Sequence, residues 1–254
     1  FLTATLPLVP TLAAAPPAAP PPDVPGGPDV RITEIMYNPA SHERGGATEW
    51  VEIANLGTRV ATLDGWYLDD EDRGHWGAFS CTLEPGAVVV LVNQRTVTRE
   101  VFVDAWFDDD DPPATVLPVR WQSLANTPGP DNERLQLLDS RGRVRDEVDL
   151  HAGPGWPDPP EGASITLVRR PDSSRDGTAW QPARPGIDHA RAVTPGGPFN
   201  GPDIGSPGRL PDSLRPSSEP PAPDHAPRVD PRSGDRRLDF IHQSRSPRIE
   251  EAHP

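Results

Sequence analysis

Short strand-like segments, each closed by turn residues, constrain the fold of this 254-residue chain more than any other feature. The three clearest segments span residues 34–39, 49–56 and 63–69. In the second segment, Val51 and Ile53 share one face at the two-residue period of a β-strand. None of the three contains a nucleophile beside a base, a phosphate-binding loop or a metal-binding motif. These segments therefore predict a fold, but they do not predict a catalytic or ligand-binding function.

Further strand signals recur along the chain between turns rich in Gly and Pro. Residues 88–92 form an unbroken apolar run, which is typical of a central strand covered on both faces. Residues 135–150 alternate around a turn at 140–142 and predict a β-hairpin. Residues 163–168 predict a last strand, and one short helix is expected within residues 97–106. Because no long amphipathic helix pattern occurs, we expect an all-β sandwich.

Composition divides the chain into parts of different character. It contains 36 Pro and 22 Gly, so much of it cannot bury enough apolar surface to offset the loss of chain entropy on folding. We expect a signal-peptide remnant at residues 1–15, a Pro-rich spacer at 16–28, a β-sandwich with long loops at 29–200, and a disordered tail rich in Pro, Arg and Asp at 201–254.

The N-terminal pattern bears on localisation. Residues 1–12 are mostly apolar and lead into Ala13, Ala14 and Ala15, as in the later part of a secretory signal. The run is too short to cross a bilayer, so no transmembrane segment is expected there. We expect an exported protein, either secreted or held at the cell envelope. The alternative is a low-complexity Ala/Pro leader with no targeting role.

The charge of the chain limits its partners. The formal net charge is −14, and all 24 basic residues are Arg. Because affinity for nucleic acid comes largely from cationic side chains that displace counterions, we expect no nucleic-acid partner. Cys81 is the single cysteine, which excludes an internal disulfide and a zinc site built from cysteines.

Two acidic clusters lie in expected loops and could supply the oxygen ligands that Ca²⁺ prefers. Neither cluster has the alternating Asp spacing of a helix–loop–helix calcium site. Solvated loop charge is the simpler interpretation, and a calcium site is the alternative. The candidate ligands are Asp69, Asp70 and Asp72 in the first cluster and Asp108, Asp109 and Asp110 in the second.

Catalytic and zinc-binding patterns are missing from the sequence. The histidines have no His-x-x-x-His spacing, and His75 is the one that lies beside an acidic cluster. There is no Gly-x-Ser-x-Gly elbow, and neither Ser80 nor Cys81 has an adjacent base. Paired carboxylates of the kind that glycoside hydrolases use stay open, because a sequence does not give their separation in space.

Tryptophans are either core residues or stacking faces for a ligand. Trp50 and Trp66 lie within expected strands and are assigned to the core. Trp76, Trp106 and Trp156 are flanked by Gly, Asp or Pro and are the candidates for exposure. A cluster of exposed aromatic rings would mark a binding patch.

Taken in order, these segments resemble the lamin tail domain in its bacterial, exported form. The resemblance covers about residues 30–200. It implies an immunoglobulin-like β-sandwich without catalytic residues, used as an accessory module alone or beside hydrolases. The similar domain of nuclear lamins docks proteins and DNA, but this chain lacks a coiled-coil rod and a basic surface. The segments that carry the resemblance are 32–39, 49–55, 63–68, 83–86, 88–92, 124–126, 134–142, 156–157, 162–170, Trp180 and 194–200.

Two hypotheses of different classes follow. The first is a non-enzymatic, exported β-sandwich module that needs no cofactor and mediates protein binding or attachment to the cell envelope. The alternative is an acidic, metal-dependent extracellular hydrolase, or an accessory fragment of one. Its site would lie between the loops at Asp69 and Asp108.

Overall fold

Two β-sheets and a two-stranded ribbon build the part of the chain that the computed structural model describes, namely residues 28–42, 44, 46–70, 76–107, 114–120, 123–125, 134–150 and 155–216. All of these residues belong to one structural unit. The expected signal remnant and nearly all of the expected spacer lie outside the described residues, as do residues 217–254.

The larger sheet has six strands, of which four lie between residues 30 and 119 and two lie between residues 165 and 182. They are β1 (Val30–Met36), β2 (Trp50–Asn55), β5 (Val88–Asn93), β6 (Thr115–Val119), β9 (Ile165–Leu167) and β10 (Trp180–Pro182). Their order across the sheet is β10-β9-β1-β2-β5-β6. Neighbours are antiparallel except β5 and β6, which run parallel. A parallel pair needs a crossover connection, and a helix between these two strands supplies it.

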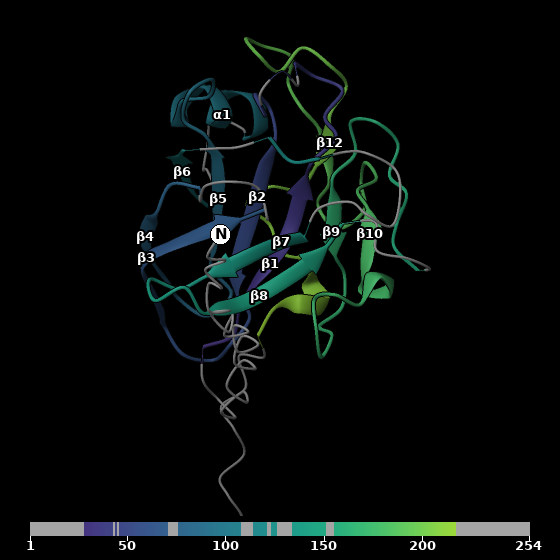
Figure 1. The fold of residues 1–254 in the computed structure, drawn as a ribbon. Helices are drawn as coiled ribbons and strands as arrows, with labels where there is room; N and C mark the ends of the chain where they lie inside the picture. Colours follow the sequence, from purple (N-terminus) through teal and green to yellow (C-terminus); the bar gives the residue numbers. More distant parts are fainter. Residues whose placement is uncertain are drawn as a thin grey trace, which may run out of the picture. The chain divides into compact units, whose positions relative to one another are not determined.

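The smaller sheet has four antiparallel strands. They are β3 (Ala61–Asp69), β4 (Phe79–Leu83), β7 (Arg134–Leu138) and β8 (Val144–Asp149). Their order is β4-β3-β7-β8. Strand β3 is irregular between Leu63 and Trp66, where Gly65 has a φ of +66° that an L side chain rarely adopts. Figure 1 shows the β7–β8 hairpin crossing β1 of the larger sheet.

The inner face of the six-stranded sheet is apolar and packs against the four-stranded sheet. Ile35, Val51 and Leu91 lie opposite one another in register and are fully buried. They share one hydrophobic cluster with Leu68 and Leu137 of the smaller sheet. This interdigitated layer is the core of the sandwich.

The outer face of the same sheet is covered at one end by α1 (Arg99–Trp106). The Thr98 hydroxyl caps the helix by accepting a hydrogen bond from its first turn. Phe102 and Trp106 then pack edge-on against Trp50, with ring centres 6.2 and 5.7 Å away. Offset and edge-on pairs of this kind stabilise aromatic clusters beyond their buried area.

Short elements complete the unit. They are the 3₁₀ turns η1 (Gly177–Ala179) and η2 (Asp212–Leu214) and the ribbon strands β11 (Arg191–Ala192) and β12 (Ile204–Gly205). The two ribbon strands run antiparallel to each other. In Figure 1, β12 is drawn in the yellow-green of the C-terminal part of the described chain.

Most elements expected from the sequence are confirmed. Strand β5 is buried at every residue, as expected of a central strand. The hairpin within 135–150, the last strand within 163–168 and the short helix within 97–106 are also present. The parallel strand β6 was not foreseen, since Pro118 and its mixed polarity obscure the signal.

The expected domain end is wrong. Residues 201–216 were assigned to a disordered tail, but Leu210 and Leu214 are 3% exposed and belong to the inter-sheet cluster. The frequent Pro and polar residues of this segment obscured its two apolar anchors and its glycines. The ordered part of the chain therefore reaches residue 216.

Candidate functional site on the outer face of the six-stranded sheet

A row of side chains crosses the outer face of the six-stranded sheet. Residues that lie opposite one another in register point to the same face, so the row can be followed strand by strand. Its apolar end shares a hydrophobic cluster with α1, and its polar end reaches the edge strand β10. From β10 to β6 the row is Gln181, Thr166, Glu34, Glu52, Val90 and Val116.

Glu34 is fully buried within this row. Its Oε1 accepts hydrogen bonds from the Ser164 hydroxyl at 2.5 Å and from the Ser206 backbone N–H at 2.8 Å. Its Oε2 accepts one from the Ser206 hydroxyl at 2.7 Å. Burial raises the pKa of Glu34 above its usual value, and these hydrogen bonds only partly oppose that rise.

Glu52 lies directly opposite Glu34 and is also buried. The Thr33 hydroxyl donates to its Oε1 at 2.7 Å, and the Gly208 backbone N–H donates to its Oε2 at 2.6 Å. Burial, and then the negative charge of Glu34, raise the pKa of Glu52 to about 8. The fold therefore favours the neutral form of the Glu52 carboxyl more than water does.

Residues 203–214, here called the C-terminal strap, close over this carboxyl pair. The backbone N–H groups of Ser206 and Gly208 donate hydrogen bonds to the two carboxyls. At Gly205 the strap approaches the sheet so closely that a Cβ would lie 2.8 Å from the Trp50 ring. A glycine is required there because any side chain would clash with a fully buried indole.

Both ends of the strap are anchored. Asp203 Oδ1 accepts hydrogen bonds from the backbone N–H groups of Ala40 at 2.6 Å and Ser41 at 3.2 Å. Burial raises the pKa of Asp203. At the other end, Leu210 and Leu214 enter the inter-sheet core. The strap is thus an integral layer of the domain.

Other polar residues of β2 and of the residue before it are also used structurally. Glu49 Oε2 accepts from the Leu124 backbone N–H at 2.8 Å. The Asn55 side chain donates to the carbonyls of Arg59 at 2.7 Å and Leu83 at 3.0 Å. These buried polar groups hydrogen-bond to backbone groups of nearby loops and hold the loops to the sheet. The polar residues of this segment are therefore structural.

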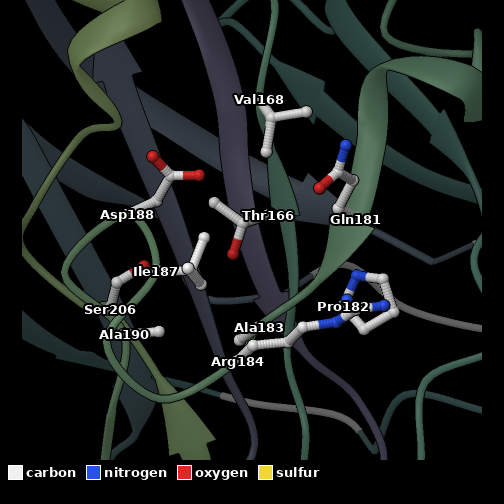
Figure 2. A pocket seen from close by; sticks show the side chains of 10 residues that line it. All are labelled: Thr166, Val168, Gln181, Pro182, Ala183, Arg184, Ile187, Asp188, Ala190 and Ser206. Carbon is white, nitrogen blue, oxygen red and sulfur yellow. The ribbon is translucent and has the colours of Figure 1, made fainter.

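A small cavity opens where the strap leaves the polar row uncovered. It has a volume of about 170 Å³ and lies over β9 and β10 (Figure 2). Thr166 is only 5% exposed, and its hydroxyl faces Glu34 and helps to oppose the rise in the pKa of that carboxyl. In Figure 2, the Ile187 side chain lies between this hydroxyl and Ser206.

The loop of residues 183–190 forms the rim of this cavity. Ile187 is 56% exposed, which is high for a large aliphatic side chain beside a cavity. Asp188 and His189 follow with φ of +47° and +66°, a backbone region that residues other than Gly rarely occupy. The Ala190 N–H donates to the Ile187 carbonyl at 2.8 Å and so closes the turn. The loop therefore holds an apolar side chain outward at a fixed place.

A second hollow, of about 330 Å³, lies on the four-stranded sheet. The Arg145 guanidinium stands 5.7 Å from the centre of the Trp66 ring. Asp139 pairs with Arg143 at 2.7 Å, and Arg145 is 3.9 Å from the same carboxylate. Trp66 is half-buried, so its assignment to the core was wrong in part: it packs against the core from outside.

The expected calcium ligands are only partly within the described residues. Asp70 is 1% exposed and its Oδ2 accepts a hydrogen bond from the Trp76 indole at 3.0 Å. Asp69 lies on β3 and is half-buried. Within the described residues, no three His, Cys, Asp or Glu side chains converge as ligands of one metal ion would. Asp72, Asp108, Asp109 and Asp110 lie outside the described residues, as does His75.

The expectation that Trp76 and Trp106 are exposed is wrong. They are 3% and 1% exposed. Trp76 is held by Asp70, and Trp106 is the last residue of α1 and belongs to the aromatic cluster around Trp50. Trp156 is half-buried and stacks on Trp180 with ring centres 6.1 Å apart. The polar, Gly or Pro neighbours of these tryptophans did not predict their exposure, because each ring packs against other parts of the domain.

Sequence reasoning missed the carboxyl pair and the cavity. Glu34 and Glu52 sit in segments that were correctly expected to be strands, but their pairing depends on the register between β1 and β2. The available signal was an acidic residue in an otherwise apolar strand. The cavity gave no such signal, since Thr166 and Ile187 are brought together only by tertiary folding.

This arrangement defines the class of the domain. Two sheets enclose an apolar core, and the carboxyl pair that could have served as an acid–base couple is sealed beneath the strap. Such a domain is an immunoglobulin-like β-sandwich. A family model, the Lamin Tail Domain, matches residues 24–152, just over half of the sequence, and the chain belongs to this family.

The match ends before β9, so the strands β9 to β12 and the strap lie beyond it. A comparison with curated protein sequences finds no match. No helix in the described part of the chain has both the length and the apolar character needed to span a bilayer.

Proposed function

We propose that this chain is an exported domain that binds a protein or another component of the cell envelope and performs no catalysis. The observation that carries this proposal is the use of Glu34 and Glu52. Both are buried, and each is hydrogen-bonded to the C-terminal strap. A catalytic carboxyl must reach its substrate, whereas these two carboxyls hold two layers of the fold together.

Export is supported by the sequence of residues 1–15, where an apolar run ends in three alanines. The acidic composition supports a partner that is not nucleic acid, because a chain with a net charge of −14 repels phosphate backbones. Binding is supported by the rigid sandwich with small hollows on two different faces.

Two assays on the full-length chain test the proposal. In the first, the protein is incubated with aryl phosphate, phosphodiester, ester and glycoside substrates, with and without millimolar Ca²⁺. We expect no turnover above that of a Glu52→Gln variant, and Ca²⁺-dependent turnover would contradict the non-catalytic assignment and favour the hydrolase alternative.

In the second assay, the protein is sedimented with envelope fragments of its own host cell. We expect saturable co-sedimentation that is lost when the fragments are first stripped with protease, since the partner is then a protein. Binding that survives stripping would point to another envelope component. Sedimentation that does not rise above a non-binding control would contradict the binding role.

A further inference from the structure

The hollow beside Trp66, between β3 and the turn of the β7–β8 hairpin, differs in charge from the chain as a whole. Three arginines line it, Arg141, Arg143 and Arg145, against two aspartates, so its lining has a net charge of +1. The chain as a whole has a net charge of −14. We propose, in addition to the binding role above, that this hollow binds a sugar acid, which is a pyranose ring that carries one carboxylate.

A single buried carboxylate holds the arginines of the hollow in place. Asp139 is 5% exposed, and its Oδ2 lies 2.7 Å from the Arg143 guanidinium and 3.9 Å from that of Arg145. Its Oδ1 accepts hydrogen bonds from the backbone N–H groups of Arg141 at 2.9 Å and Arg143 at 3.1 Å. One carboxylate does not neutralise two guanidinium groups, so positive charge remains at a fixed place. A guanidinium presents its N–H groups in a planar fork that matches the two oxygens of a carboxylate.

The Trp66 ring supplies an apolar surface next to this charge. It is half-buried, lines the hollow, and has the Arg145 guanidinium 5.7 Å from its ring centre. One face of a pyranose ring is made mainly of C–H groups, and contact of that face with an indole removes apolar surface from water. A sugar acid combines such a face with a carboxylate, and the hollow combines the two matching surfaces.

The charge balance of the hollow favours a carboxylate over a phosphate. One carboxylate brings one negative charge, which matches the net charge of the lining. A phosphate monoester carries almost two negative charges at neutral pH. Asp64 is exposed at the same hollow and accepts a hydrogen bond from the Ser80 hydroxyl at 3.0 Å. Its charge opposes a doubly charged ligand more than a singly charged one.

An acidic peptide fits the hollow less well. Peptides that bind in extended form are held mainly by main-chain hydrogen bonds. The backbone N–H groups of the turn are already used within it: Gly142 donates to the Asp139 carbonyl at 2.8 Å, and Asp139 donates to the Arg143 carbonyl at 3.0 Å. The hollow therefore offers side chains to a ligand, and a glutamate side chain has no ring to cover Trp66.

The size and the remaining lining of the hollow suit one sugar ring. Its volume of about 330 Å³ lies at the lower end of the range of about 300–1,000 Å³ for small-molecule pockets. Thr62 and Ser140 add hydroxyl groups to the wall. Each of these hydroxyls can donate to or accept from a sugar hydroxyl.

The test uses methyl glucuronoside and methyl glucoside, which differ only in having a carboxylate or a hydroxymethyl group at C6. Amide and indole NMR spectra of the ¹⁵N-labelled full-length chain are recorded during titration with each compound at neutral pH. We expect saturable shifts at Trp66, Arg141 and Arg145. The glucuronoside should bind about tenfold more tightly, as one charge-assisted hydrogen bond allows, and added salt should reduce this preference.

Three variants sharpen this titration. Arg145→Gln keeps the polar stem but removes the charge, and it should abolish most of the preference for the glucuronoside while leaving Asp139 paired with Arg143. Trp66→Leu should weaken binding of both compounds, since both use the ring. Arg95→Gln, at an exposed position in the turn after β5, removes the same charge elsewhere and should change neither.

The proposal is overturned if the glucuronoside causes no saturable shift at the hollow, or if Arg145→Gln retains the full preference. Two further ligands test the choice of class. N-acetyl-glutamate amide carries one carboxylate without a sugar ring, and uridine monophosphate carries a phosphate. Binding of either as tightly as the glucuronoside would contradict a site for a sugar acid. The sedimentation assay above uses none of these ligands, so the hollow and the general binding role fail separately.

Discussion

The two faces of the six-stranded sheet are built in opposite ways. On the inner face, Ile35, Val51 and Leu91 meet the smaller sheet and bury only carbon. One residue away along the same strands, Glu34 and Glu52 face outward and are just as buried. The apolar side chains of the inner face can pack against any apolar surface of suitable shape. The carboxyls of the outer face need hydrogen-bond donors at fixed positions. The comparison shows that the sandwich core accounts for the burial of one face of this sheet and that the other face is buried by α1 and the strap.

Both faces use residues beyond the matched family region. Leu167, Leu210 and Leu214 join the inter-sheet core, and the outer carboxyls are satisfied by Ser164, Ser206 and Gly208. Buried carboxyls without hydrogen-bond donors are strongly destabilising. The strap is therefore required by the composition of β1 and β2.

The largest effect is expected from removal of the strap. A chain ending at Asn200 loses the burial of Leu210 and Leu214 and exposes the carboxyl pair. Two buried leucines alone contribute about 3–6 kcal/mol, which is comparable with the whole stability of many domains. We expect this variant to lack a cooperative thermal transition by circular dichroism. A chain ending at Pro216 is the control and should melt like the full-length protein; equal melting of both truncations would refute the role of the strap.

A core truncation on the inner face should come next in size. Leu91→Ala leaves a cavity among fully buried side chains and should lower the free energy of unfolding by about 2–5 kcal/mol. The measurement is urea denaturation at neutral pH. This loss should be nearly independent of pH, because no titratable group of the row is altered. A strongly pH-dependent loss would mean that the two faces are not independent.

The stability that the outer face contributes should instead depend on pH. The pKa of Glu52 is raised in the folded state to about 8 from its ordinary value of 4.5, so the folded chain binds more protons than the unfolded chain between these values. Stability from this group is therefore complete below about pH 4.5 and is lost as the pH rises toward 8. The pKa values of Glu34 and of Asp146, a buried residue of β8, are raised as well, because burial disfavours their charged forms.

Glu52→Gln tests this dependence, since the amide keeps the size of the side chain and cannot ionise. Relative to the wild type, the variant should be less stable at pH 5 by about 1–2 kcal/mol, through altered hydrogen bonding, and should lose less stability between pH 5 and pH 8. Glu84→Gln, at an exposed position, is the matched control and should follow the wild type. Parallel pH profiles for Glu52→Gln and the wild type would contradict the buried pair.

The smallest expected effect concerns a residue that was first considered as a calcium ligand. Asp70→Asn keeps an acceptor for the Trp76 indole but removes the charge. We expect a change of less than about 1 kcal/mol in the free energy of unfolding, whereas Asp70→Ala should cost about 1–3 kcal/mol by leaving a buried donor unsatisfied. Equal losses in the two variants would argue against this hydrogen bond.

Sequence patterns predicted the inner face well and the outer face poorly. The two-residue period of Val51 and Ile53 reports burial of carbon, which needs no specific neighbour. Glu52 occupies the alternate position, where an acidic residue usually means exposure to solvent. Its burial depends on Gly208, which is 156 positions away, and no local pattern carries that information. For the same reason, the Pro-rich composition of residues 201–216 concealed a structural layer.

Hydrogen exchange at the strap tests the central claim most directly. The backbone N–H groups of Ser206 and Gly208 donate to Glu34 and Glu52 beneath the surface. If the strap is an integral layer of the domain, their protection should approach that of Val51 in the central sheet and should far exceed that of the exposed Ile187. Exchange of Ser206 and Gly208 as fast as that of Ile187 would contradict the account.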